Sequence, residues 1–261
     1  MPMSSFALAA ALALAASLAA AGGRAEADWD AQPTAHFLIS HQREAMSLGD
    51  YNKLERVYDA LRPDLWPLVP SMANERTRLY LYKDRESFLA GRFSPPAWSG
   101  GLFSEREGEK ALALFEPLDT ATAAHELTHL YFHAYFGEQA APPWLDEGLA
   151  SMLQNEALTL LDPRDKGPVL RGVLPLAEFF KARPERDSPA ARVSAWYQQA
   201  HSVTRFIKRG HIEASFPAFC GKLRDGTDTE TALREVYGYA DLAAFQKAWD
   251  QWRPRKAVGQ P

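Results

Sequence analysis

The residues best suited to chemistry lie in TAAHELTHLYFHAYF, residues 122–136, where two histidines stand four positions apart. On an α-helix such residues are separated by about 40° around the axis and about 6 Å along it, so His125 and His129 can direct their imidazoles at one ion. Neutral imidazole suits Zn²⁺, and catalytic zinc sites use three protein ligands and a water. Glu126 lies about 100° around the helix from His125. That position favours a carboxylate beside the ion, where it could take a proton from the bound water.

This geometry is why His-Glu-x-x-His is the metalloprotease signature. The pattern alone would also fit a buried amphipathic helix that happens to carry three histidines. Two further features favour the metal site. The pattern lies in a stretch with a clear helical character, and Glu147 follows eighteen residues after His129 in PPWLDEGLASML.

HELTH followed by PPWLDEGLA resembles the gluzincin metallopeptidases, and most closely the small bacterial peptidases called peptidase MA-like. Weaker likeness extends over most of the chain, through HFLIS, LYLY and YQQAHSVTRFIKRG. The resemblance implies a zincin-like fold with one zinc ion held by His125, His129 and Glu147. It also implies that Glu126 is the general base.

The sequence departs from the family pattern in two places. Many gluzincins carry an aspartate four residues after the ligand glutamate, where it orients a histidine, and here that position is Ser151. Asp146 or Asp119 could supply this outer carboxylate, although Asp146 would equally suit the first turn of a helix. The chain has no Gly-x-Met-Glu-Asn stretch, the element with which gluzincin aminopeptidases hold a free amino terminus. Its absence disfavours exopeptidase action, and the choice between endo- and exo-action stays open.

Amide hydrolysis passes through an oxyanion, which a hydrogen-bond donor opposite the zinc would stabilise. Tyr197 and His201, again four residues apart, could present a phenol and an imidazole from one helical face. A tyrosine on such a late helix is a candidate donor in the resembling family. The alternative is that Tyr197 packs beside Trp196 with its hydroxyl bonded nearby.

The segment KALALF, residues 110–115, reads as a strand directly before the histidine helix. In zincin-like enzymes an edge strand there aligns the substrate backbone as an added strand. We therefore expect Ala113, Leu114 and Phe115 to offer main-chain groups to an extended peptide. The alternative is an internal strand with no free edge.

The remaining candidates have simpler interpretations. His133 is rotated by about 80° from His125, which favours a hydrogen-bonded helix histidine over a ligand. Cys220, the only cysteine, lies among apolar neighbours as a buried thiol, so no intramolecular disulfide can form. Gly148 is expected to let its helix approach the histidine helix closely. His36, His41 and His211 have no partner ligands nearby in the sequence.

The elements change character along the chain. Strands are predicted at 35–40, 77–84 and 110–115, with a helix after residue 44 that Pro63 should end. From residue 119 the pattern is helix after helix, with Asp119 or Thr120 as the first cap and Pro142 and Pro143 opening the second helix. The expected class is α+β, in one domain over 28–256 with a sheet-containing lobe at about 34–116 and a helical lobe at about 119–252.

Length and charge limit the function classes. The chain has 261 residues and a formal net charge of −4, and no basic run suggests a nucleic-acid partner. Residues 1–27 resemble a signal peptide cleaved after Ala21 or Ala27, which predicts export to the periplasm or beyond. No membrane span is expected once it is removed. An uncleaved leader acting as a membrane tether is the alternative.

These observations lead to one expectation and two rivals. The expectation is an exported zinc peptidase acting on a peptide or protein substrate. The first rival is a catalytically idle zincin-fold protein of the cell envelope that binds zinc and a partner, and Glu126 disfavours it because such a site needs no base. The second rival is a structural helical domain in which His125 and His129 have no ligand role.

Overall fold

The computed structural model describes residues 29–42, 46–97, 99–106, 108–161, 173–185 and 188–253, with the side chains of 158–161 left out. The predicted leader, residues 1–27, lies outside these residues. The expected α+β class is confirmed, with the strands early in the chain and the helices mostly after them. The strands are β1 (Asp30–Pro33), β2 (Phe37–His41), β3 (Thr77–Tyr82), β4 (Leu102–Arg106) and β5 (Glu109–Phe115).

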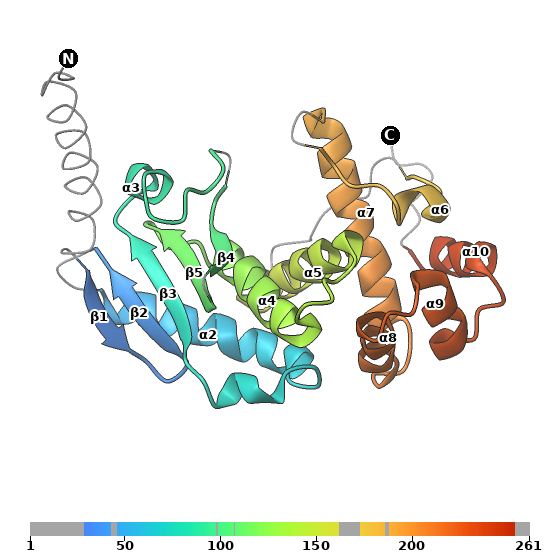
Figure 1. Cartoon of the computed structure of the whole chain (residues 1–261), viewed down its shortest axis with the longest axis horizontal. Helices are drawn as coiled ribbons and strands as arrows, with labels where there is room; N and C mark the ends of the chain where they lie inside the picture. Colours follow the sequence, from blue (N-terminus) through green and yellow to red (C-terminus); the bar gives the residue numbers. More distant parts are fainter. Residues whose placement is uncertain are drawn as a thin grey trace, which may run out of the picture.

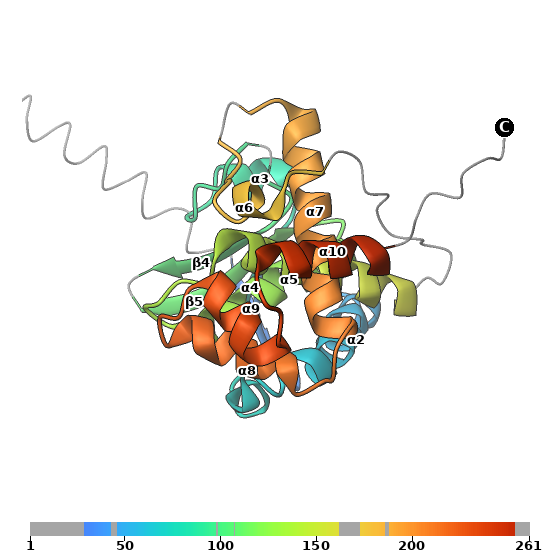
Figure 2. The ribbon, with the colours of Figure 1, turned by 90° about the vertical axis from the view of Figure 1, so that its right-hand side faces the viewer.

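Helices make up most of the rest of the described chain. Figure 1 shows the sheet at one side, α4 and α5 in the middle, and α7 to α10 at the other side. Seen from that helical side, α8, α9 and α10 lie in front (Figure 2). None of the described helices is long and apolar enough to cross a membrane. The helices are α2 (Leu48–Leu65), the 3₁₀ helix η1 (Pro70–Ala73), α3 (Arg85–Leu89), α4 (Thr120–Phe136), α5 (Pro143–Leu161), α6 (Leu176–Phe179), α7 (Ala190–Arg209), α8 (Ser215–Arg224), α9 (Thr229–Tyr237) and α10 (Leu242–Trp252).

The sheet is mixed, in the order β1-β2-β3-β5-β4. Its centre is parallel, since β2 pairs with β3 and β3 with β5 in that sense, while β1 and β4 run antiparallel to their neighbours. The expectation that the strand carrying Ala113, Leu114 and Phe115 is an edge strand is wrong. That strand, β5, lies between β3 and β4, and Ala113 is paired on both sides, with Tyr80 and with Leu102. The edge nearest α4 is β4.

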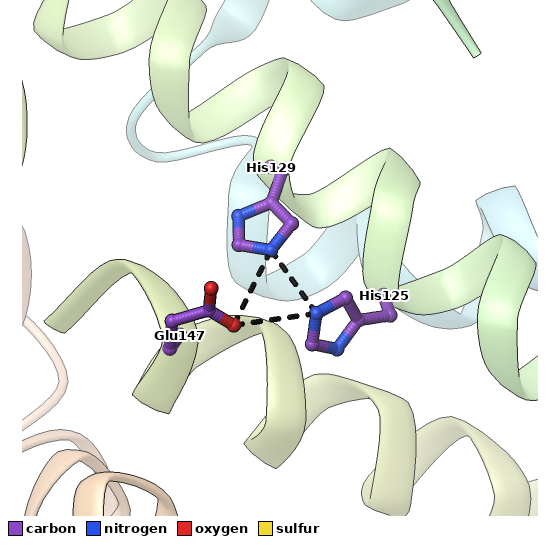
Figure 3. A group of neighbouring side chains, drawn as sticks. All are labelled: His125, His129 and Glu147. Atoms are coloured by element: carbon purple, nitrogen blue, oxygen red, sulfur yellow. Dashed lines mark hydrogen bonds and ion pairs between the residues drawn. The ribbon is translucent and has the colours of Figure 1, made fainter. Parts of the chain in front are cut away.

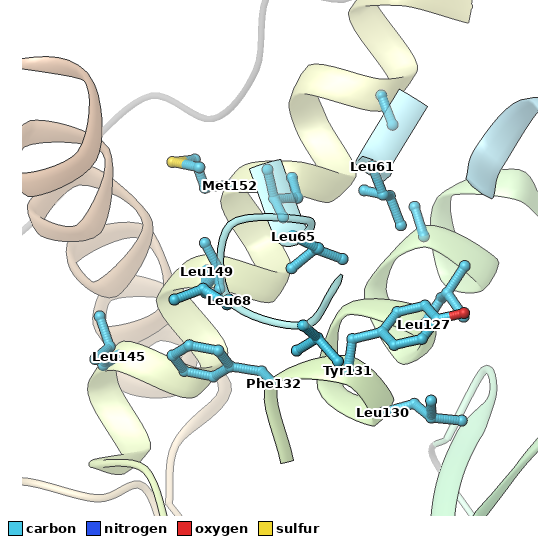
Figure 4. Packing of buried hydrophobic residues seen from close by; sticks show 14 of the residues in the cluster. Leu61, Leu65, Leu68, Leu127, Leu130, Tyr131, Phe132, Leu145, Leu149 and Met152 are labelled. Atoms are coloured by element: carbon cyan, nitrogen blue, oxygen red, sulfur yellow. The ribbon is translucent and has the colours of Figure 1, made fainter. Parts of the chain in front are cut away.

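Alternation along the strands divides the apolar residues between two cores. Leu79 and Leu112 face the main core, where side chains of α2, α4 and α5 pack together (Figure 4). Ala111 and Ala113 face the other way, toward Phe88 of α3. Full burial of a leucine side chain stabilises a fold by about 1.5–3 kcal/mol, so this core can hold the chain together without a disulfide.

Two single-residue expectations have different outcomes. Cys220 is fully buried, and burial raises the pKa of its thiol, as expected of an inert cysteine. Pro63, however, does not end its helix, because α2 continues to Leu65. Leu61 and Leu65 are both buried, so packing holds the last turn in spite of the donor that proline lacks.

Close packing joins α5 to α7. A Cβ on Gly148 would lie 2.6 Å from the carbonyl oxygen of Ala200 and would collide with Thr204. The helix that approaches Gly148 is therefore α7, and the expectation that this glycine serves the contact with the histidine helix is wrong. The consequence for the site is that α5 and α7 are held at a backbone-to-backbone distance.

Charged side chains link α7 to both α5 and α2. Lys208, only 7% exposed, lies 2.9 Å from Asp64, and Arg209 lies 2.6 Å from both Asp64 and Glu156. Burial alone would raise the pKa of Asp64, but the hydrogen bonds from Arg209 and Lys208 outweigh it and lower the pKa. Asp64 therefore stays ionised between its two cations.

Candidate metal centre

Local sequence fixes where the two helices of the site begin. The side chain of Asp119 caps α4 by accepting hydrogen bonds from the main-chain N–H groups of Ala121 and Thr122 at 3.2 and 3.1 Å. Pro143 opens α5, as proline tolerates a first turn where the missing N–H has no partner. Asp119 is thus a helix cap, and of the two carboxylates considered for the outer role only Asp146 remains.

Three side chains from these helices converge (Figure 3). The Nε2 atoms of His125 and His129, one turn apart on α4, are 3.1 Å from each other. Oε2 of Glu147, on α5, lies 3.4 Å from the first nitrogen and 3.6 Å from the second. The three residues expected as ligands therefore direct one donor atom each at a common point.

Both imidazoles are held by a second partner that fixes their chemistry. Nδ1 of His129 donates to Asp146 at 2.8 Å, and Nδ1 of His125 donates to the amide oxygen of Gln154 at 3.0 Å. With Nδ1 of each ring engaged in this way, Nε2 is the nitrogen that is left to face the common point. Gln154 was not foreseen, although it stands seven residues after Glu147 and therefore on the same face of α5.

Charges within the site act strongly on one another. Burial alone would raise the pKa of Glu147, but the two imidazoles outweigh it and lower the pKa to about 2. Burial alone would also raise the pKa of Asp146, but hydrogen bonds to His129 and His133 outweigh it and lower the pKa. Burial would lower the pKa of His129, yet Asp146 and Glu147 raise it well above its usual value. Both carboxylates are therefore anionic at neutral pH.

Glu126 follows His125 on α4, and a hydrogen bond from the sheet holds its carboxylate. Its Oε2 accepts a hydrogen bond of 2.7 Å from the main-chain N–H of Phe103, on the edge strand β4. The approach of the strand depends on Gly101, where a Cβ would lie 2.5 Å from Thr122 and 3.2 Å from Cγ of Glu126. The sequence did not predict β4, so this support for the carboxylate was missed.

Tyr197 and His201, both on α7, have different charged neighbours. Burial raises the pKa of Tyr197, and so do the charge of Glu147, a hydrogen bond to Glu147 and, more weakly, the charge of Glu126. Its phenol therefore keeps its proton and can donate to a group at the site. His201 faces other charges, those of Arg205 and Glu156. Only Tyr197 is brought near the predicted ligands by the interactions that the structure gives.

His201 should make the fold sensitive to acid. Burial, with a smaller effect of Arg205, lowers its pKa to about 4, below the value of about 6.5 for an unfolded chain. Its neutral form therefore contributes stability above about pH 6.5 that is lost as the pH falls toward about 4, amounting to about 3 kcal/mol. Urea unfolding across this range, with chelator throughout, should show a smaller loss for His201→Gln than for wild type. Equal losses would contradict the assignment.

His133 belongs to the outer part of the site. Its Nε2 lies 3.3 Å from the second oxygen of Asp146, which agrees with the predicted hydrogen-bonded histidine. With His129 and Asp146 it forms a second group whose candidate ligand atoms lie within 4.8 Å of one another. Since Asp146 already holds Nδ1 of His129, we assign the second group to support of that imidazole.

Asp146→Asn should weaken zinc binding by about 10- to 100-fold, the range expected for a partner that orients a metal-bound histidine. The amide cannot supply the anionic acceptor that stabilises Nδ1–H of His129. Competition against a chromophoric chelator measures the affinity, with Ser151→Ala on the same helix as control. An unchanged affinity for Asp146→Asn would remove this carboxylate from the site.

Comparison of the sequence with models of known protein families finds none that matches, and a search of curated proteins finds no match either. The class of the protein is therefore argued from the residues and their geometry.

Proposed function

We propose that this protein is a zinc-dependent peptidase of the gluzincin type, with a zincin-like fold. The observation that carries the proposal is the convergence of His125, His129 and Glu147 on one point, with Glu126 next to His125 on the same helix. The donor set is two imidazole nitrogens and one carboxylate oxygen, which is the type of set found in catalytic zinc sites with an open fourth position.

The residues present fit a divalent cation. Oε2 of Glu147 is buried and lies 3.4 and 3.6 Å from the Nε2 atoms of His125 and His129, so a cation held by the three atoms would replace these long contacts by direct ligation. Asp146 and Glu147 supply negative charge at the site, and both imidazoles turn their Nε2 atoms to it, from which a bound cation would displace any proton. Bound zinc would polarise a carbonyl group and lower the pKa of water.

The chain's own residues would carry the remaining steps. Glu126 accepts the proton of the attacking water and passes it to the leaving amine, as a general base and then a general acid. Tyr197, whose raised pKa keeps its hydroxyl protonated, donates a hydrogen bond to the oxyanion that develops on the scissile carbonyl. His201 has no role in this scheme, because the charges that act on it lie elsewhere.

The edge of the sheet suggests how a peptide would lie. Since β5 is internal, β4 is the edge strand next to α4 in the sheet that the structure describes. An extended peptide that adds to an open edge gains main-chain hydrogen bonds whatever its sequence. This favours a peptide backbone as the substrate, and side-chain pockets would set the preference among peptides.

A peptide-library digestion tests the proposal. Purified protein is analysed for metal, then incubated with the library as isolated, with chelator, and with chelator followed by added zinc. We expect one zinc ion per chain and cleavage that chelator abolishes and zinc restores. Bound zinc without cleavage would favour the catalytically idle rival, and absence of bound metal after zinc addition would favour the structural one.

Tyr197→Phe should lower kcat by about 100-fold, the typical cost of losing one oxyanion donor. The ring and its packing beside Trp196 stay, so zinc content should not change. Steady-state kinetics on a cleaved library peptide, with metal analysis of the same sample, provide the measurement. A kcat equal to that of wild type would remove Tyr197 from the mechanism.

A further inference from the structure

The edge strand β4 makes a direct contact with the proposed base. Phe103 is paired with Leu112 of β5 in the antiparallel register. Its N–H donates to Glu126 at 2.7 Å, so this group points away from β5. In an antiparallel strand the outward groups recur at every second residue, and Glu105 is therefore the next outward position. The amide of Phe103 is thus an outward group of the sheet that is used by a side chain of α4.

The residue just before β4 also restricts the space around the aliphatic part of the Glu126 side chain. At Gly101 the main chain passes so close to α4 that a Cβ would lie 2.5 Å from Thr122, 2.8 Å from Leu114 and 3.2 Å from Cγ of Glu126. Contacts below 3 Å require something to move. The side chain of Glu126 therefore packs at Cγ against Gly101, the residue before β4, and one of its carboxylate oxygens accepts a hydrogen bond from β4.

From these contacts we infer that Phe103 is a positioning residue, whose main-chain N–H holds the carboxylate of Glu126 in one orientation beside the three ligands. The inference rests on the proposed function, since it assigns this hydrogen bond a part in the reaction. A glutamate side chain has several rotatable bonds, and ordering it costs conformational free energy. The hydrogen bond orders the Glu126 side chain before substrate binds, and it leaves Oε1 as the oxygen that accepts the proton.

The ring of Phe103 contacts a second part of the site. Its centroid lies 5.0 Å from that of His133, edge to face. His133 in turn bonds Asp146, which holds His129. One residue of the strand therefore touches the base through its amide and the support of a ligand through its ring. The two contacts can be removed separately.

Three variants separate the amide from the ring. Phe103→Pro removes both, Phe103→Ala removes only the ring, and Glu105→Pro places a proline at the next outward position. Proline is tolerated on an edge strand where its nitrogen faces outward, so the ladder to β5 is kept. We expect kcat of Phe103→Pro to be about 10- to 100-fold below that of Phe103→Ala, with similar KM and zinc affinity. Glu105→Pro should lower kcat much less.

Equal kcat values for Phe103→Pro and Phe103→Ala would overturn the inference. A change in KM or in zinc affinity alone would also overturn the inference, because a misplaced base lowers kcat. If Phe103→Pro does not fold, hydrogen exchange of the wild-type protein and of Glu126→Ala tests the inference in its place.

Hydrogen exchange of the Phe103 amide tests the contact without any turnover. In the wild-type protein this amide should exchange slowly although it faces outward, and in Glu126→Ala it should exchange at least about tenfold faster. Fast exchange in wild type would overturn the inference. Slow exchange in a protein that cuts no library peptide would mean that the contact exists and the proposed function is wrong.

Discussion

Glu126→Gln should lower kcat by about 10²- to 10⁴-fold, the range for loss of a general base. The amide has the size of the carboxylate and still accepts a hydrogen bond from Phe103, so the side chain should keep its place. It cannot take a proton from water. Steady-state kinetics with a cleaved peptide measure kcat, and metal analysis of the same sample should give the zinc content of wild type.

A matched control for this substitution is Glu138→Gln, which makes the same chemical change at an exposed position just after α4. We expect it to behave as wild type in both measurements. If Glu126→Gln retains most of the wild-type kcat with its zinc in place, another group must be the base. If it loses zinc, the residue acts on the metal and its catalytic assignment would have to be withdrawn.

The other large effect is expected at the third ligand. Glu147→Gln should weaken zinc binding by more than the about 100-fold expected at most for an outer partner such as Asp146. The substitution removes a negative charge that lies within 3.6 Å of both imidazole nitrogens. Competition with a chelator gives the affinity, and hydrolysis at limiting zinc should fall in parallel.

The same control, Glu138→Gln, shows whether loss of one acidic residue anywhere on the chain affects zinc. Wild-type affinity in Glu147→Gln would mean that the carboxylate does not bind the ion. The zinc site would then have to be sought at His129, His133 and Asp146, the second group of ligand atoms, and His133→Ala would identify it.

The placing of the two histidines on one helix face could be predicted because it depends on short-range geometry. His125 and His129 are one helical turn apart, and no distant contact is needed to place them on one face. Spacing alone could not predict that Glu147 lies near the two histidines, because this contact depends on how α4 and α5 cross. That prediction came from the family resemblance. Gln154 was missed for the same reason: which residue of α5 meets His125 is decided by that crossing.

The sheet was the less predictable part. The strand β4 is five residues long and follows a segment rich in proline and glycine, so little local pattern marks it. The order of strands is set by packing over long sequence distances, which explains why β5 looked like an edge and is internal. Pro63 gives the opposite case, in which buried leucines at the end of α2 outweigh a reliable local helix-breaking signal.

The ion cluster of Asp64, Lys208 and Arg209 bears on how substrates could enter. It joins a helix of the sheet-containing half to the helix that carries Tyr197. Swinging the halves apart would leave buried charges without their partners, at a cost of about 3–5 kcal/mol. If the chain is the proposed peptidase, its two halves should therefore keep one arrangement when a peptide binds.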